Sequence, residues 1–316
     1  MKSSSIARAL LCLVLLLPTA ILAKPALWVV KDADTTLYLF GTIHLLPKDT
    51  DWHYPALDRA LAQSDALVVE ITDDNPANMT ALVLRLGMDA AHPLSSLLSQ
   101  GDFHRLGLAA RKAGLPGTTA LNVMRPWLAT LTLTMAPLTK AGLDPARGVD
   151  RQLRDSMTKA GKPVRALETA EEQIHFLADM PTRLQLDMLR QTVHQADHAS
   201  VELKNLLDAW QAGDDAAIAR LENELMKRET PALYQRLLVQ RNAAWAGRIK
   251  TMLDTPGTVF IAVGAAHLAG PDSVQAQLQK LGVGSTRVPA LSQVEENASA
   301  PTSRQLKALS PMTSLP

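Results

Sequence analysis

Cysteine is nearly absent from this chain of 316 residues: Cys12 is the only one, and it lies inside an apolar run near the N-terminus. If that run is removed, the remaining chain contains no cysteine. Disulfides, zinc–thiolate sites and a cysteine nucleophile are then excluded. A lipid anchor on Cys12 is not predicted either, because Leu11 before it is not the small residue that a lipoprotein cleavage site has.

An excess of charge of one sign is also lacking. The chain has 32 Lys and Arg against 31 Asp and Glu, which gives a formal net charge of +1. No basic stripe is visible, so the sequence argues against a nucleic-acid partner. Aromatic residues make up only 4% of the chain, and Leu, Ala, Val and Ile must therefore do most of the packing. With 47% hydrophobic residues, the chain can still build a core in one large domain or two closely packed ones.

The one long hydrophobic run of the sequence is at the N-terminus. Lys2 and Arg8 precede an apolar segment at residues 9–17, and a short segment with several small residues follows, up to Ala23. This order is typical of a secretory signal peptide, which we predict at residues 1–23 with cleavage near Ala23. The segment is shorter than the ~20 residues of a membrane span, although an uncleaved anchor stays an alternative. We therefore predict a periplasmic or secreted protein with no stable membrane span after cleavage.

Strand-like segments gather at the two ends of the chain, and helical patterns fill the middle. The predicted strands are residues 27–30, 35–40, 66–69, 162–167, 258–263 and 285–288. Residues 259–263 are entirely apolar, which is typical of a strand that is buried on both faces. We therefore predict an α/β (α+β) fold whose central mixed sheet is built from N- and C-terminal strands. A large helical insert is predicted at about residues 75–255.

Composition sets the predicted domain boundaries. One folded domain is predicted at residues 24–289, and it includes the helical insert. Residues 290–316 are rich in Ser, Ala, Pro, Asn and Thr and hold few large apolar side chains, so we predict a disordered tail there. Within the insert, residues 170–253 are expected to be almost entirely helical, with breaks near Pro181, Gly213 and Pro231.

One pattern occurs twice in the sequence: an apolar strand followed by Gly-x-x-His. The first copy runs from Gly41 to His44, and the second from Gly264 to His267; Glu70 directly follows a third apolar strand. Catalytic and ligand groups of α/β folds collect beyond the carboxyl ends of strands. We interpret the two glycines as structural residues that let the backbone turn sharply and leave room above the sheet edge. Two imidazoles and a carboxylate are therefore expected to meet at one edge of the sheet.

Two histidines and a carboxylate suit a divalent first-row metal ion with open coordination positions. The sequence therefore predicts a metal site with His44, His267 and Glu70 as ligands, which would activate water and polarise a carbonyl. Other interpretations stay open, because a lone histidine at a strand end is often a satisfied turn residue and a lone glutamate a solvated charge. His194 and His198 form a second candidate pair, spaced i, i+4 on one predicted helix. Their polar surroundings favour a solvated helix face instead.

Six short motifs resemble, in order, those of the TraB/GumN family, whose members are related to the Tiki-type proteases. The motifs are GTIHL at residues 41–45, VEI at 69–71, GVD at 148–150, LETAEEQ at 167–173, RNAAW at 241–245 and VGAAHLAG at 263–270. They extend over nearly the whole predicted domain. The resemblance implies a metal-dependent, hydrolase-like site that uses His44, Glu70 and His267.

The same resemblance adds further candidate residues. It implies that Glu168, at the end of a strand, is a fourth ligand or the general base. Arg241 would clamp a substrate carboxylate or stabilise an oxyanion, and its neighbour Asn242 is a further catalytic candidate. Both lie in a long predicted helix, where a buried ion pair or a packing hydrogen bond is an equal alternative. Asp150 and Gln173 are interpreted as structural polar groups, at a helix start or in packing.

Two functions of different classes fit these residues. The first is a secreted metal-dependent peptidase or related amide or ester hydrolase. It would act on a peptide or other small extracytoplasmic substrate with a divalent ion, for which manganese, cobalt and zinc are candidates. The second is a non-catalytic extracytoplasmic protein that holds a peptide, haem or metal on the same scaffold, because the same ligands serve both roles. Metal-stimulated cleavage that a chelator stops would favour the first function, and haem absorbance the second.

Overall fold

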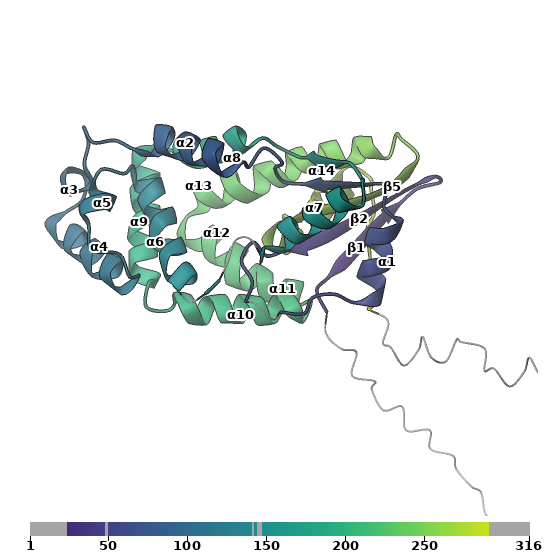
Figure 1. Cartoon of the computed structure of the whole chain (residues 1–316), viewed down its shortest axis with the longest axis horizontal. Helices are drawn as coiled ribbons and strands as arrows, with labels where there is room; N and C mark the ends of the chain where they lie inside the picture. The colour runs from purple at the N-terminus through teal and green to yellow at the C-terminus, as the bar shows by residue number, and fades with distance from the viewer. Residues whose placement is uncertain (1–23, 48–49, 141, 144–146, 291–316) are drawn as a thin grey trace, which may run out of the picture.

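The structure is a computed structural model that describes residues 24–47, 50–140, 142–143 and 147–290 (Figure 1). The predicted signal peptide, and the predicted tail apart from its first residue, lie outside this part of the chain. Among the helices that the structure describes, none combines the length and the apolar character needed to cross a membrane.

Six strands form one mixed sheet. They are β1 (Leu27–Lys31), β2 (Thr35–Thr42), β3 (Ala66–Val69), β4 (Val164–Ala166), β5 (Gly257–Gly264) and β6 (Thr286–Arg287). Their order in the sheet is β4-β3-β5-β2-β1-β6. The first four of this order are parallel to one another, whereas β1 is antiparallel to both β2 and β6. The predicted α/β fold is confirmed, because the late strand β5 lies between the early strands β2 and β3.

Helices cover the sheet and build a lobe beside it (Figure 1). Those that pack on the sheet or on its end are α1 (Pro55–Gln63), α7 (Val149–Lys159), α10 (Ala199–Gln211), α11 (Asp215–Ile218), η2 (Ala219–Glu224), α14 (Gln240–Met252), η4 (Ala265–Leu268) and α15 (Val274–Lys280). Those of the lobe and its junction with the sheet are α2 (Pro76–Gly87), α3 (Leu94–Leu97), α4 (Gln100–Lys112), α5 (Thr119–Asn122), α6 (Pro126–Lys140), α8 (Ala170–Ala178), α9 (Thr182–Gln195), α12 (Leu225–Glu229), α13 (Pro231–Tyr234) and η3 (Gln235–Val239).

Alternating side chains of the sheet fill two separate cores. Phe40 and Phe260 point to a core shared with α1, α7 and α10. Leu39 and Ile261, one position away in the same strands, point to a core shared with α14 and α15. Residues 260–263 are at most 1% exposed, which confirms the predicted burial on both faces for these residues, whereas Val259 is only partly buried. The sheet is therefore the middle layer of a three-layer arrangement.

Between residues 170 and 253 the helical pattern breaks at the three predicted places and at one more. Pro181 caps α9, Gly213 follows α10 with a φ of +63°, and Pro231 begins α13. The further break separates α9 from α10, so the interpretation of His194 and His198 as one helical pair is wrong. The chain turns there because α9 buries its face in the lobe, whereas α10 buries its face against the sheet core.

Candidate functional site

The two Gly-x-x-His segments meet because their strands are parallel neighbours. β2 pairs with β5 along its whole length, and the register places Thr42 opposite Gly264. Both strands therefore end at the same edge of the sheet, where β5 continues into η4 and His267. β3 flanks β5 on the other side, and Glu70 comes directly after β3. The structure thus brings the residues that follow three strands to one place.

Gly264 marks the point where the three predicted ligands approach one another. A Cβ atom built on this glycine would lie 3.3 Å from Glu70 Oε1, 3.6 Å from His267 Cδ2 and 3.8 Å from His44 Nε2. The backbone of Gly264 has a φ of −51° and a ψ of 137°, which any residue can adopt. The turn from β5 into η4 therefore does not require the conformational freedom of glycine. The value of Gly264 is the space that the missing side chain leaves between three polar groups.

Glycine is also required where backbone segments pass close to the first motif. A Cβ on Gly41 would stand 3.0 Å from Ala265 Cα, so this glycine lets the two motif loops touch. A Cβ on Gly148, at the start of α7, would stand 2.6 Å from the carbonyl oxygen of His44. The N–H of Val149 donates to the carbonyl of Ile43 at 2.9 Å. These contacts fix the start of α7 against the loop that carries His44.

His44 is held through one of its ring nitrogens. Its Nδ1 lies 3.1 Å from Asp150 Oδ1, and its side chain is 62% exposed. Partial desolvation of the ring opposes a charge, but the hydrogen bond to Asp150 and the negative charge of Glu70 raise the pKa of His44 to about 9. Asp150 was interpreted as a structural group of a helix start, and it does lie in the first turn of α7. It also orients His44 and leaves Nε2 facing the space beside Gly264.

His267 is buried and held in one tautomer. Asn242 donates through Nδ2 to the carbonyl of Asp272 at 2.8 Å, so its Oδ1 accepts from His267 Nδ1 at 2.6 Å. The proton of the neutral ring is therefore on Nδ1, and the lone pair is on Nε2. Burial lowers the pKa of His267 to about 3, and the charge of Arg241 adds to the effect. The ring centroid lies 4.4 Å from that of Trp245, which packs in the core as predicted.

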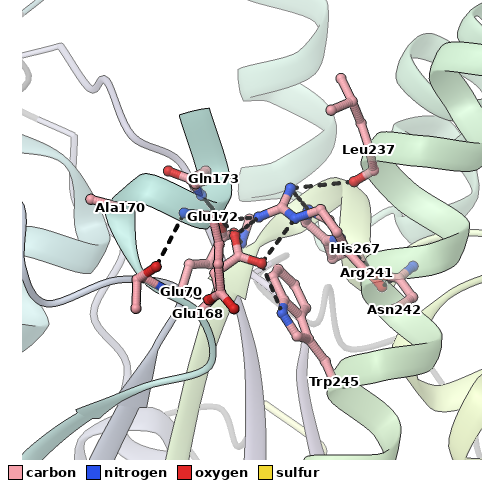
Figure 2. Close-up of polar contacts among 12 residues, drawn as sticks. Glu70, Glu168, Ala170, Glu172, Gln173, Leu237, Arg241, Asn242, Trp245 and His267 are labelled. Carbon is pink, nitrogen blue, oxygen red and sulfur yellow. Dashed lines mark hydrogen bonds and ion pairs between the residues drawn. The ribbon is translucent and has the colours of Figure 1, made fainter. Parts of the chain in front are cut away.

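A buried guanidinium joins the two candidate carboxylates (Figure 2). Arg241 Nη2 lies 2.8 Å from Glu70 Oε2 and 2.5 Å from Glu168 Oε1, and Nη1 lies 3.2 Å from His267 Nε2. Gln173 donates to both carboxylates, at 3.0 Å and 3.1 Å. Of the alternatives for Arg241, the structure thus shows the buried ion pair, made with two partners at once. Gln173 is a polar member of this network.

The two carboxylates differ in their surroundings. Burial favours the neutral acid at Glu70, but His267 when protonated, Arg241 at every pH and the N–H of Gly264 lower its pKa to about 2. Burial raises the pKa of Glu168 above its ordinary value, even though the positive charge of Arg241 opposes the shift. All four hydrogen bonds to Glu168 come from Arg241, Gln173 and Trp245. This leaves Glu168 as an anchor for Arg241 rather than an open proton acceptor.

The described residues hold no group of three or more imidazole, thiol or carboxylate side chains that is arranged as a complete metal-ligand set. The physical reason is the position of Arg241, whose guanidinium lies against both Glu70 and His267 Nε2. A positive group is therefore already present beside two of the three predicted ligands. His44 Nε2 and Glu70 Oε1 face the space beside Gly264, and neither atom has a hydrogen bond to Arg241. Glu70 Oε1 accepts from the N–H of Gly264.

Two residues outside the six motifs donate hydrogen bonds to the backbone of the Gly-x-x-His segments or of the residues directly after them. Trp210 of α10 donates through Nε1 to the carbonyl of Gly41 at 2.8 Å. Asn223 of η2 donates to the carbonyls of Ala266 and Ala269, both at 2.9 Å. The sequence signal for them is weak, because each is a single polar-tipped residue in an otherwise ordinary helical stretch. Only packing reveals that both reach the loops.

The family can be assigned from the whole domain. The model of the TraB/PrgY/gumN family matches residues 26–287. This range includes all six strands that the structure describes, and it includes His44, Glu70, Glu168, Arg241 and His267. The chain belongs to the TraB/PrgY/gumN family. The resemblance read from the six motifs is thereby confirmed. The match covers both Gly-x-x-His segments as well as the helical lobe between them.

Relatives of this TraB/PrgY/gumN protein are found among enterobacteria. The chain is 27% identical over 259 residues to a protein of Escherichia coli (strain K12) described as "Uncharacterized protein YbaP", and the match covers 81% of this chain and 92% of that protein. A protein of Shigella flexneri with the same description matches with the same identity and coverage. No solved structure matches the chain at a comparable level of significance. These comparisons support the family, and the printed descriptions name no activity.

Proposed function

We propose that this TraB/PrgY/gumN protein is a metal-dependent hydrolase of peptides or related amides and esters that works outside the cytoplasm. One observation carries the proposal: His44 Nε2, a carbon of the His267 ring and Glu70 Oε1 all lie within 4 Å of the position where Gly264 lacks a Cβ. Residues 1–23, with the pattern of a secretory signal, support the extracytoplasmic location.

The residue types of this site, two imidazoles and a carboxylate, suit a divalent metal ion, and His267 Nε2 would have to exchange its contact with Arg241 for the metal. Each histidine is anchored through Nδ1, His44 on Asp150 and His267 on Asn242. Metal-binding histidines in proteins are oriented in the same way, through a partner on the nitrogen that does not bind. Two imidazole nitrogens and one carboxylate are ligands that manganese, cobalt and zinc accept. Such an ion would supply a Lewis acid and an activated water molecule.

The residues that are not metal ligands position Arg241 for contact with the substrate. Glu168, Trp245 and Gln173 fix the carboxylate end of the network, so the charge of Arg241 is held in place next to Glu70. A fixed buried cation stabilises negative charge that develops on a substrate oxygen, because little reorganisation is needed. His44 is the exposed member of the group, so a substrate reaches the site from its side.

A cavity of about 110 Å³ next to Arg241 supports the assignment to a substrate of peptide type. Phe176, Trp245 and Ala244 form the apolar part of its walls, and the other lining residues are polar or charged: Glu168, Glu172, Gln240, Arg241 and Arg248. The guanidinium of Arg241 lies 5.5 Å from the Phe176 ring centre and 4.6 Å from that of Trp245. An apolar side chain of a substrate would therefore find room beside a fixed positive charge.

Elemental analysis and a peptide-library cleavage assay test the proposal together. The purified protein is expected to hold about one divalent ion per chain and to cleave peptides in a reaction that a chelator stops and added metal restores. His44→Ala and His267→Ala should each abolish cleavage and lower the metal content. His104→Ala is the matched control, since His104 is an exposed residue of α4 outside the cluster.

Three outcomes would contradict the proposal. Cleavage at the parental rate by either active-site variant would exclude the assigned residues. Full activity in the presence of chelator would exclude the metal. Stoichiometric metal or haem without any cleavage would instead support a binding protein on the same scaffold.

A further inference from the structure

A second cavity lies in the helical lobe, away from the strand ends. It has a volume of about 370 Å³ and is formed by residues of α4, α6, α9, α10 and η2, together with the α9–α10 connection. Small-molecule sites in proteins typically measure about 300–1,000 Å³. None of its lining residues belongs to the cluster around Arg241. The cavity is therefore a candidate site of its own.

The walls of this cavity combine apolar side chains with uncompensated negative charge. Leu133, Leu138 and Leu206 contribute to the apolar part. Glu202 of α10 and Glu222 of η2 line it as well, and the structure shows no hydrogen bond or ion pair of either carboxylate with a described residue. The negative charges of the two carboxylates repel each other.

The cation that lines the cavity does not neutralise these carboxylates. It is Lys112, which forms an ion pair with Asp197 instead. Glu222 is only partly accessible to solvent, and its pKa is raised by burial and by the charge of Glu202. A carboxylate that is drawn out of water without a partner costs free energy that a bound cation would recover.

We propose that this cavity binds a ligand with an ammonium group on an apolar body. The ammonium would lie between Glu222 and Glu202 and donate charge-assisted hydrogen bonds to both carboxylates. The apolar body would cover the leucines of α6 and α10. Two sources carry this chemistry: a free aliphatic amine, and the lysine side chain of a peptide. The inference does not rest on the proposed hydrolase function.

Calorimetric titration with hexylamine tests the charge requirement, with 1-hexanol as the neutral probe of similar size. Hexylamine is expected to bind saturably at one site per chain, and 1-hexanol at least about tenfold more weakly, a difference of about 1.4 kcal/mol. Glu222→Gln and Glu202→Gln should each weaken hexylamine by a similar factor. Glu224→Gln should leave binding unchanged, because Glu224 is an exposed residue of the same π-helix that does not line the cavity.

The source of the ammonium is tested by competition. An acetylated apolar peptide with a single lysine should displace hexylamine if peptides are the source, whereas the same peptide with norleucine at that position should not. Failure of the lysine peptide to displace bound hexylamine would identify a free amine. Both results support the site.

Three results would overturn the proposed ammonium site: no saturable binding of hexylamine, equal binding of hexylamine and 1-hexanol, or unchanged hexylamine affinity in both glutamine variants. Glu202 is exposed, so Glu202→Gln keeps the test decisive even if Glu222→Gln folds poorly. Retention of hexylamine binding in the His44→Ala and His267→Ala variants would separate this site from the proposed metal site.

Discussion

Thr42 and Gly264 lie opposite each other in the adjacent parallel strands β2 and β5. Each belongs to one Gly-x-x-His segment, Thr42 at its second position and Gly264 at its first. This one-residue offset lets the two loops pass in contact, with a Cβ on Gly41 predicted to meet Ala265. The two histidines therefore reach the same edge of the sheet by different paths: His44 stays exposed, and His267 is buried.

If the proposed metal site exists, Gly264→Ala should remove metal binding while the protein stays folded. The backbone of Gly264 accepts an alanine, but the new Cβ would occupy the space between Glu70, His44 and His267. We expect a loss of stability of no more than about 2 kcal/mol and a metal content near zero, measured by denaturant unfolding and elemental analysis. Gly247→Ala is the control, because a Cβ there meets no atom within 4 Å. Parental metal content in Gly264→Ala would place the metal elsewhere.

Arg241→Met should destabilise the protein by about 3–5 kcal/mol, because it leaves two buried carboxylates without their shared counter-ion. The free energy of unfolding in denaturant measures the effect. Arg248→Met, at an exposed position of the same helix, should change stability by no more than about 0.5 kcal/mol. If Arg241→Met were as stable as Arg248→Met, the network would not contribute to the fold as described.

Trp210→Phe should cost more stability than Trp127→Phe, although both indoles are almost fully buried. Trp210 Nε1 donates to the carbonyl of Gly41, so phenylalanine leaves that carbonyl without its donor. Trp127 Nε1 has no hydrogen-bond partner among the described residues, so its replacement removes an unsatisfied donor. We expect a difference of about 1–3 kcal/mol between the two variants in parallel unfolding experiments. Equal losses would show that the Gly41 hydrogen bond is not needed.

Asp215 should make the protein less stable as the pH rises. Burial raises its pKa from 3.8 to about 6, although Arg287 opposes the shift. Between these two pH values the folded state keeps a proton that the unfolded state has lost, so this contribution to stability is lost as the pH rises through about 6. The advantage of Asp215→Asn over the parent should therefore grow by about 2–3 kcal/mol between about pH 4 and pH 8. Unfolding curves for both proteins at each pH measure it, and a constant difference would contradict the assignment.

The sequence allowed the convergence of His44, Glu70 and His267 to be expected because all three follow apolar strands. It did not show that β5 lies between β2 and β3, which is what brings Glu70 to the side of Gly264. It also suggested that Gly264 is needed for a sharp turn, whereas any residue can adopt its backbone conformation and the reason for glycine is steric. Spacing identifies which residues end a strand, but not which side chains will compete for the same space.

The roles of the helical residues show the same limit. Arg241 and Asn242 are adjacent in α14, yet one pairs with carboxylates and the other fixes the tautomer of His267. The break between α9 and α10, which separates His194 from His198, depends on two helices burying their faces in different cores. No periodicity along the chain distinguishes those cores.

The sequence by itself determined the local features of this protein: the apolar strands, the glycines and histidines that follow them, and the secretory pattern at the N-terminus. These depend on residues close together in the chain, whose order fixes hydrophobic periodicity and backbone preference. Only the tertiary structure decided that a guanidinium from α14 lies between Glu70 and Glu168, and that Glu222 lines a cavity with no counter-ion among the residues that the structure describes. Such contacts depend on how distant helices pack, because charge pairing and burial are set in space and not along the chain.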